Sequence, residues 1–332
     1  MQCFFEPKIS TNYSKNKDNF MVCEKPLYEF SGEGEFVVAH IKKQNLSTWE
    51  ALEIISSHIG VKARELGYCG LKDKQATTEQ YISVPRKFET ALTQFAHDNL
   101  KILDTTYHNN KLRIGHLKGN HFTIILPKND DFAQLEQNIL WIDKLGMPNY
   151  FGSQRFGKTD DNYALGKDIL EGKKKLRDKK KTNFFISAYQ SHLFNQWLEN
   201  RVKYSIENPP MADTNHPFAI LEGDVLMHYP YGRLFLATDL ETENKRFYEK
   251  DISPTGLLVG NKATLAQSQA WDMEKLIHQS FDVKVQGARR YAWIFPQEMK
   301  IEQTDKNIKL EFYLPKGSYA TVLLEQIGVM VA

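Results

Sequence analysis

The strongest constraint on the fold is a change in the chain near residue 156, where short strand-like runs give way to longer helical ones. Before this point, β-rich runs predict strands at 19–24, 35–41 and 80–84. Beyond it, apolar residues recur with helical spacing at 162–170 and 185–202, and a last strand is predicted at 309–314. A chain of 332 residues is long enough for two domains, and this order of elements predicts an α+β fold.

Local signals define two features more closely. Ser47 and Glu50 have the spacing of a capping box, and Gly60 can end a helix, so we expect a helix between residues 47 and 60. Asn109-Asn110 lies between two strand-like runs and predicts a hairpin turn.

The charge of the chain is concentrated in one segment. The net charge is only +2, so no field of the whole molecule points to a nucleic-acid partner, but residues 172–181 hold seven cations and one anion. Such a run is most often a solvated loop or helix face. The alternative is a contact with a phosphate backbone, where Lys173, Lys174 and Lys175 would displace condensed counterions.

The cysteines and the apolar segments indicate an intracellular protein. Cys3, Cys23 and Cys69 form no CxxC pair, and we interpret them as reduced thiols of a cytoplasmic protein. No stretch approaches the roughly 18 apolar residues of a membrane span, so we expect no membrane association. The first residues lack a basic region followed by an apolar one, which makes secretion unexpected.

Residues 70–79, with the sequence GLKDKQATTE, place Asp73 between Lys72 and Lys74 just after a strand-like run. The common interpretation of Lys-Asp-Lys is a solvated turn. The functional interpretation is a carboxylate that neighbouring cations keep ionised and that faces a polyanion attracted by the same lysines.

A second segment, residues 149–157, has the sequence NYFGSQRFG. Phe151 is a candidate ring for stacking on a base, and Asn149 would project to the same side of an extended segment. Arg155 is a candidate contact with a phosphate backbone. Each residue also has an ordinary interpretation: Phe151 as core, Asn149 as the start of a turn after Pro148, and Arg155 as a surface cation.

Taken together, these segments resemble the D-type (TruD) family of tRNA pseudouridine synthases. Residues 70–80 are similar to the family's GxKDxxAxTxQ motif, and residues 149–157 to its NYFGxQRFG motif. Further similar segments occur in the same order, at 18–22, 32–35, 111–122, 287–290 and 314–321. The likeness therefore extends through most of the chain.

The resemblance implies an architecture. It implies a pseudouridine synthase catalytic domain with a mixed, largely antiparallel sheet, which is interrupted by an inserted α/β domain. The catalytic domain would be discontinuous and contain residues 1–152 and 286–332, and the family-specific insertion would be residues 153–285.

The resemblance also implies a reaction, the isomerisation of a uridine at position 13 of tRNA. By motif, Asp73 would be the catalytic residue acting at C1′ of a flipped-out uridine, Phe151 the stacking ring and Asn149 part of a polar network. Phe20 would be an aromatic residue near the substrate. Independently of the resemblance, the position of Lys72 beside Asp73 makes it a candidate to pair with that carboxylate or with a phosphate of the substrate. For a basic residue ahead of Phe20, Lys15 and Lys17 are both candidates.

The reaction adds no atom from outside the substrate, so we expect no cofactor and no metal. The partner expected is tRNA, and the sequence implies no protein partner. The carboxylate would either add covalently or abstract a proton, and the sequence leaves both routes open. Two other functions remain to be weighed: an RNA-binding protein that does no chemistry, and a methyl-donor-dependent RNA modifier. The second is disfavoured because no Gly-rich nucleotide loop follows a strand.

Overall fold

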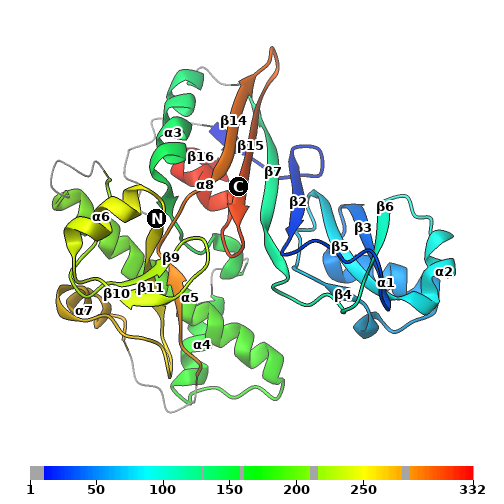
Figure 1. Cartoon of the computed structure of the whole chain (residues 1–332), viewed down its shortest axis with the longest axis horizontal. Coiled ribbons are helices and arrows are strands. Elements are labelled where there is room, and N and C mark those ends of the chain that lie inside the picture. The colour runs from blue at the N-terminus through cyan, green and yellow to red at the C-terminus, as the bar shows by residue number, and fades with distance from the viewer. Residues whose placement is uncertain (1–10, 129–130, 158–160, 210–215, 279–284, 332) are drawn as a thin grey trace. The chain divides into compact units, whose positions relative to one another are not determined.

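A computed structural model of the chain describes residues 11–128, 131–157, 161–209, 216–278 and 285–331, and it confirms an α+β protein (Figure 1). Contacts within the chain divide it into two compact units. Among the described residues, unit 1 contains Leu140–Phe295 and Ser318–Gly328, and unit 2 contains 11–139, Pro296–Gly317 and 329–331. The division expected from the family resemblance, with residues 153–285 inserted into the catalytic domain, stays a prediction.

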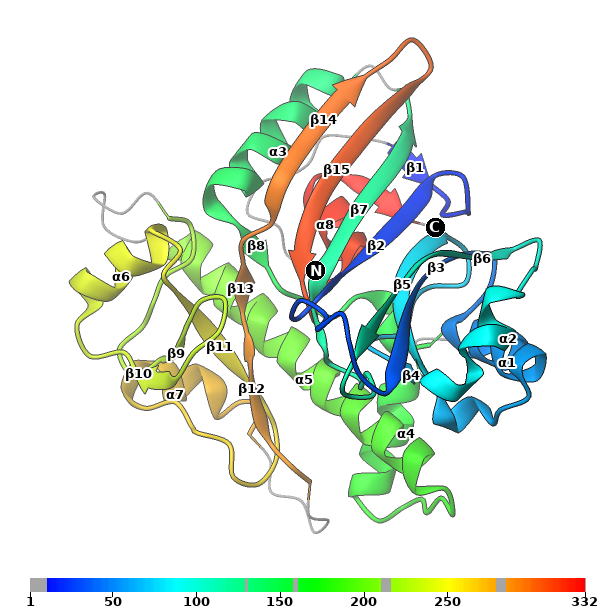
Figure 2. The ribbon, with the colours of Figure 1, turned by 45° about the vertical axis from the view of Figure 1, so that its right-hand side comes forward.

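Unit 2 is built on one long sheet, with strand order β14-β15-β7-β2-β5-β3-β6 and β4 beside β5 (Figure 2). Strands β2 and β5 are parallel and the other neighbours are antiparallel, which confirms the predicted mixed sheet. A separate parallel pair joins β1 (Thr11–Tyr13) to β16 (Val329–Val331). The strands of the long sheet are β2 (Phe20–Pro26), β3 (Phe36–Gln44), β4 (Gly67–Tyr68), β5 (Thr77–Pro85), β6 (Leu100–His108), β7 (Leu117–Pro127), β14 (Gln297–Gln303) and β15 (Asn307–Pro315).

Helix α1 (Thr48–Ile59) packs on this sheet and has the ends that the sequence predicts. Ser47 and Glu50 form the capping box, and Gly60 ends the helix with φ 73°. The inward face of α1, including Ile55, packs against apolar side chains of β3 and β5. Short helical segments follow, at η1 (Ala63–Glu65), η2 (Arg86–Phe88) and α2 (Glu89–Thr93).

The predicted hairpin at Asn109-Asn110 is wrong. The strands on either side, β6 and β7, do not pair with each other: β6 pairs with β3, and β7 pairs with β2 and β15. The physical reason is that both strands have partners far away in the chain, so Asn109-Asn110 leads from one part of the sheet to another. The chain at this point packs closely against Gly34, where an added Cβ would lie 2.5 Å from His108 C and 2.6 Å from Asn109 N.

Unit 1 contains an antiparallel sheet with strand order β10-β9-β11-β12 and a long helix against it. The helix α5 (Lys179–Glu207) places Phe194 and Trp197 on β11, where Gly256 leaves room for them; a Cβ there would lie 2.3 Å from the Trp197 ring. The strands of this sheet are β9 (Val225–His228), β10 (Leu234–Leu236), β11 (Ile252–Leu258) and β12 (Ala288–Tyr291). A separate antiparallel pair joins β8 (Met147–Pro148) to β13 (Trp293–Ile294). The remaining helical segments are η3 (Ser153–Arg155), α4 (Asn162–Leu170), α6 (Leu240–Tyr248), α7 (Ser268–Glu274) and α8 (Ala320–Gln326), while α3 (Phe132–Leu145) contains the boundary between the units.

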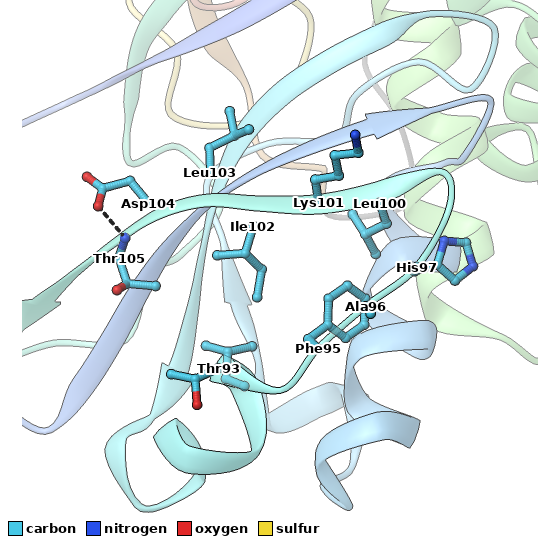
Figure 3. Close-up of a pocket in the computed structure, with 11 residues that line it drawn as sticks. Thr93, Phe95, Ala96, His97, Leu100, Lys101, Ile102, Leu103, Asp104 and Thr105 are labelled. Carbon is cyan, nitrogen blue, oxygen red and sulfur yellow. Dashed lines mark hydrogen bonds between the residues drawn. The ribbon is translucent and has the colours of Figure 1, made fainter.

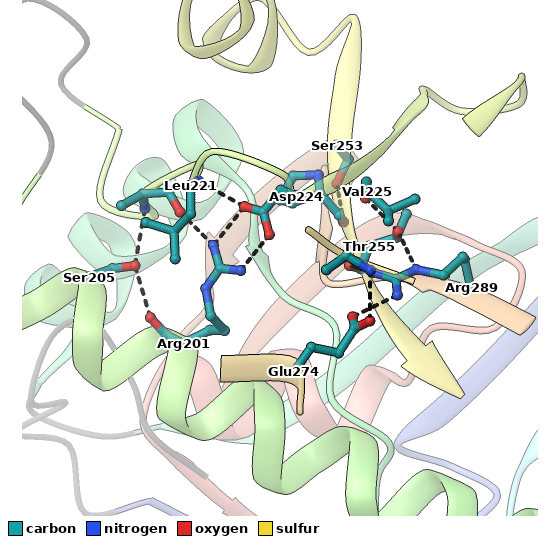
Figure 4. A network of polar contacts seen from close by, with 12 residues as sticks. Arg201, Ser205, Leu221, Asp224, Val225, Ser253, Thr255, Glu274 and Arg289 are labelled. Atoms are coloured by element: carbon teal, nitrogen blue, oxygen red, sulfur yellow. Dashed lines mark hydrogen bonds and ion pairs between the residues drawn. The ribbon is translucent and has the colours of Figure 1, made fainter. Parts of the chain in front are cut away.

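Buried charges crosslink the elements of unit 1 (Figure 4). Arg201 of α5 makes a two-pronged ion pair with Asp224, at 2.6 and 2.8 Å, and both side chains are almost fully buried. Arg289 of β12 pairs with Glu274 of α7 through one contact of 2.6 Å, and these side chains are buried as well. These pairs fix α5 and α7 to the sheet. No helix in the described ranges has the length and apolarity of a membrane span.

Candidate active site

Asp73 lies in unit 2, in the irregular segment between β4 and β5, with its side chain 38% exposed. Its Oδ2 atom accepts a hydrogen bond of 2.8 Å from Lys15 Nζ. Of the two lysines open in the sequence, Lys15 is therefore the one that meets Asp73, whereas Lys17 pairs with Asp18. The Thr77 hydroxyl donates to the Lys17 carbonyl at 2.7 Å and so attaches the Lys15 segment to β5.

Lys72 does not pair with Asp73, and this part of the sequence interpretation is wrong. Its ammonium forms a buried ion pair with Glu24, whose side chain has no exposed surface, while that of Lys72 is 5% exposed. The second Glu24 oxygen accepts from the Tyr81 N–H at 3.2 Å. The physical reason is that β2 presents Phe20, Val22 and Glu24 to the interior. The Glu24 carboxylate therefore lies within reach of the Lys72 ammonium. A substrate contact by Lys72 stays a prediction.

Phe20 lies near Asp73, but below the surface. The Lys15 ammonium lies 5.0 Å from the centre of the Phe20 ring, and Phe20 is only 2% exposed. The centre of its ring lies 6.0 Å from the centre of the Phe122 ring. This burial argues against a direct contact between Phe20 and a base. The Phe20 ring instead lies beneath the Lys15 ammonium and helps to hold it in place.

The loop that follows β8 in unit 1 holds Asn149 and Phe151 by contacts with α5 and β12. The Phe151 N–H and C=O both pair with the Asn195 amide, at 2.8 and 2.9 Å. The guanidinium of Arg290 lies over the Phe151 ring at 3.8 Å and donates to the Asn149 side-chain oxygen at 2.9 Å. The Asn149 amide nitrogen donates to the Tyr291 carbonyl at 3.0 Å.

These contacts define what each group of the loop can do. Phe151 is half-buried and keeps part of its surface, whereas Asn149 is buried with both amide atoms engaged, so its contact with uracil stays a prediction. Burial lowers the pKa of Arg290 to about 10, which still leaves a cation at neutral pH. Within the described residues, no carboxylate lies within 4 Å of Arg290 or Arg155.

Arg155 and the basic run are the predicted contacts with the RNA backbone. Arg155 donates to the hydroxyls of Ser187 and Ser191 on α5, at 2.5 and 3.3 Å, and burial lowers its pKa. The three residues Lys173, Lys174 and Lys175 lie exposed between α4 and α5. Glu171 pairs with Lys173 at 2.5 Å and raises its pKa, so part of the charge is internally compensated. Their contact with RNA stays a prediction.

Two other features of unit 2 are separate from the predicted site. A hollow of about 630 Å³ lies between α2 and β6 and is lined mainly by apolar side chains such as Phe95 and Ile102 (Figure 3). No predicted site residue lines it. Cys23, His40 and Glu79 also lie close together, but Glu79 is paired with Lys42 and burial raises the pKa of the Cys23 thiol to about 11. Cys23 and Cys69 are free thiols, and Cys3 lies outside the described residues.

Sequence reasoning missed Glu24, Lys43 and Arg290. For Glu24 and Lys43 the signal was the strand period, since each occupies an inward position of its strand in a place normally held by an apolar residue. Arg290 belongs to a segment that resembles the family, residues 287–290, but its contact with Phe151 joins residues 139 positions apart in the sequence and leaves no local pattern.

The fold of the whole chain is that of a pseudouridine synthase. It matches the crystal structure of a protein described as putative tRNA pseudouridine synthase D (TruD), from Methanosarcina mazei, with a TM-score of 0.73, covering 99% of this chain and 96% of that one. At 20% sequence identity, this likeness shows the fold alone.

The family follows from the sequence comparisons. A sequence model described as "tRNA pseudouridine synthase D (TruD)" matches residues 3–177 and 174–327. A tRNA pseudouridine synthase D of Wolinella succinogenes is 44% identical, over 96% of this chain and 95% of the relative. One from Campylobacter jejuni strain RM1221 is 46% identical, over 96% and 93%. The chain belongs to the tRNA pseudouridine synthase D (TruD) family, and it is an isomerase.

Proposed function

We propose that this enzyme converts uridine 13 of tRNA to pseudouridine and that the Asp73 carboxylate acts at C1′ of a uridine flipped out of its stack. The bond between N1 and C1′ breaks, the uracil turns, and a bond between C5 and C1′ forms. The proton lost from C5 is balanced by one gained at N1, so no cofactor or co-reactant is required. We place the reaction in the cytoplasm, where its substrate would be found.

One observation supports this role most directly. Asp73 is a partly exposed carboxylate whose neighbouring cations serve different purposes: Lys72 is buried against Glu24, while Lys15 contacts the carboxylate itself at 2.8 Å. The Lys15 ammonium holds this carboxylate by a direct ion pair at a partly exposed position. A carboxylate that attacks C1′ or accepts a proton acts in its ionised form. A protein that only bound RNA would gain nothing from an anion facing phosphates.

The other predicted residues take supporting roles. Phe151 stacks on the base that leaves the helix, which returns roughly 1–3 kcal/mol of the unstacking cost. Arg290 packs on that ring and is itself held by the Asn149 side-chain oxygen. We keep for Asn149 the predicted contact with the uracil edge. Arg155 and the lysines 173–175 bind phosphates.

The decisive experiment compares Asp73→Asn with Asp18→Asn. Asp18 is a matched control, because it is also an aspartate paired with a lysine of the same segment, but its side chain is 75% exposed. Each purified variant is incubated with an unmodified tRNA transcript without added cofactors, and pseudouridine is mapped at single-nucleotide resolution. A transcript with cytidine at position 13 controls for the site.

We expect Asp73→Asn to form no pseudouridine and to keep tRNA affinity within about threefold, while Asp18→Asn behaves as the wild type. Retained turnover in Asp73→Asn would contradict the proposed chemistry. Pseudouridine at another nucleotide would contradict the site but not the reaction. Loss of activity together with loss of affinity would move Asp73 to RNA binding.

Phe151 is tested by replacement with Leu, which keeps apolar bulk but removes the aromatic face. We expect the single-turnover rate to fall by tenfold or more, since only the extruded base stacks on this ring, with the dissociation constant for tRNA nearly unchanged. Equal losses in rate and affinity would assign Phe151 to the positioning of the whole RNA.

A further inference from the structure

The last residue but one of strand β3 is a lysine, at a position where strands normally bury apolar side chains. Val37, Ala39, Ile41 and Lys43 alternate along the strand, and all four side chains are buried. Lys43 has no exposed surface. Because a buried ammonium is costly unless it is hydrogen-bonded, the partners of Lys43 show what the protein gains from it.

Both partners of Lys43 are main-chain carbonyls. Its Nζ donates to the Leu46 oxygen at 2.5 Å, in the turn between β3 and α1, and to the Asp73 oxygen at 3.0 Å. Within the part of the chain that the structure describes, this is the one hydrogen bond made by the main chain of Asp73. The ammonium therefore ties the irregular segment that carries Asp73 to strand β3 and to the turn that leads into helix α1.

The neighbouring contacts do not duplicate this tie. The Lys72 N–H donates to the Thr48 hydroxyl at 2.9 Å, and the Asn45 N–H donates to the Ala76 carbonyl at 3.3 Å. They hold the segment on either side of Asp73. The Asp73 carbonyl belongs to the planar peptide group that follows its own Cα, so fixing it restricts the ψ angle of Asp73 and the direction of its side chain.

We propose that Lys43 is a positioning residue for the isomerisation: its buried ammonium holds the Asp73 carbonyl against the β3–α1 turn and thereby sets the direction of the carboxylate. This inference rests on the proposed catalytic role of Asp73. Small displacements of a reacting group are expensive, since a misplacement of about 1 Å can lower a rate by about 10²-fold.

The electrostatic surroundings make the tie sensitive to pH. Burial lowers the pKa of Lys43 to about 8; the charges of Asp73 and Glu50 oppose this shift, and the charge of Lys72 adds to it. Glu50 is itself paired with Lys74, and Lys72 with Glu24. As the pH rises through about 8, Lys43 loses its proton, and a neutral amine holds the two carbonyls less strongly than an ammonium does.

The first test compares Lys43→Met with Lys42→Met. Lys42 is the matched control, because it precedes Lys43 on β3 but is 39% exposed and pairs with Glu79 at 3.0 Å. Rates are measured in single turnover at pH 7, with enzyme in excess over a tRNA transcript. We expect Lys43→Met to slow isomerisation 10- to 100-fold with tRNA affinity within threefold, and Lys42→Met to match the wild type. A wild-type rate in Lys43→Met would overturn the proposal.

The pH profile separates positioning from general structural support. We expect the single-turnover rate of the wild type to fall at least threefold between pH 7 and 9 with a midpoint near 8. The slow rate of Lys43→Met should lack that transition, because the titrating group is gone. A variant that is slower but keeps the wild-type midpoint would show that another group titrates, and Lys43 would then be structural only.

A second measurement remains available if Lys43→Met does not fold. In protein labelled with ¹³Cε-lysine, the Lys43 signal is recognised in NMR spectra by its midpoint near pH 8. We expect Asp73→Asn to lower that midpoint, because it removes an anion that favours the ammonium. An unmoved midpoint would overturn the coupling of Lys43 to Asp73. The activity of Asp73→Asn tests the proposed function separately. Retained turnover would contradict that function, independently of the titration midpoint of Lys43.

Discussion

Replacing Lys72 by Met tests whether this lysine serves the fold or the substrate. In the structure, its ammonium and the Glu24 carboxylate are almost completely buried against each other. Removing one partner of such a pair typically costs 3–5 kcal/mol, because the remaining charge has neither water nor a counterion. Glu24 would keep the Tyr81 N–H, at 3.2 Å, and the neighbouring Cys69 thiol, which are neutral groups and do not replace the lost ammonium. We therefore expect Lys72→Met to lose about 4 kcal/mol, roughly a thousandfold in the folding equilibrium.

Lys74→Met is the matched control on the other side of Asp73. Its ammonium pairs with Glu50 at 2.5 Å, but the side chains are 58% and 39% exposed. Exposed pairs contribute about 0–1 kcal/mol, so this variant should unfold nearly with the wild type. Urea unfolding followed by circular dichroism at pH 7 measures both free energies.

The double variant Glu24→Gln/Lys72→Met completes the measurement. It carries no unpaired buried charge, so it should lose clearly less stability than the sum of the two single variants. If Lys72→Met loses no more unfolding free energy than Lys74→Met does, the buried pair is not formed and the reasoning fails. A weakened salt dependence of tRNA binding in a fully stable Lys72→Met would restore the phosphate contact that the sequence suggested.

Three further outcomes follow from the same structure. Arg201→Met should cost about 3–5 kcal/mol in urea unfolding because it leaves the buried Asp224 unpaired. Burial lowers the pKa of His216 to about 3, so below pH 6.5 the unfolded state binds a proton that the folded state does not. The free energy of unfolding should therefore decrease as the pH is lowered from about 6.5 to 3, and it should decrease less steeply in His216→Gln. Replacing Lys173, Lys174 and Lys175 together by Gln should reduce the slope of log affinity against log salt, measured by filter binding, and an unchanged slope would make the run a solvated surface.

The sequence predicted elements best where the signal was local. The capping box at Ser47 and Glu50 and the glycine at position 60 gave both ends of α1, because a helix terminus is determined by a few neighbouring residues. The hairpin at Asn109-Asn110 failed for the converse reason: which strands pair depends on partners far away in the chain, here β3 for β6 and β2 and β15 for β7.

The same difference between local and long-range determinants applies to the candidate site. The motifs gave Asp73 and Phe151 as candidates, and Lys15 as one of two. They did not give the environment of these residues, since Glu24 reaches Lys72 across 48 positions and Arg290 reaches Phe151 across 139. The motifs select candidate site residues, whereas their supports are selected by packing. Glu24 and Lys43 appear in the sequence as a charge at an inward strand position, and Arg290 leaves no local pattern.

Lys43 shows what such a support costs. A lysine pKa lowered from 10.5 to about 8 means that at pH 7 burial of the ammonium costs about 3 kcal/mol relative to the unfolded chain. Between pH 8 and 10.5 the unfolded chain still binds the proton that Lys43 has lost in the folded protein. The cost of burial therefore disappears as the pH rises through this range. Because Met is similar in length and carries no charge, Lys43→Met should unfold at an equal or higher urea concentration than the wild type while it isomerises uridine more slowly. A variant both less stable and less active would mean that Lys43 serves the core, whereas opposite changes in stability and rate would show that the fold carries this charge for the carboxylate of Asp73.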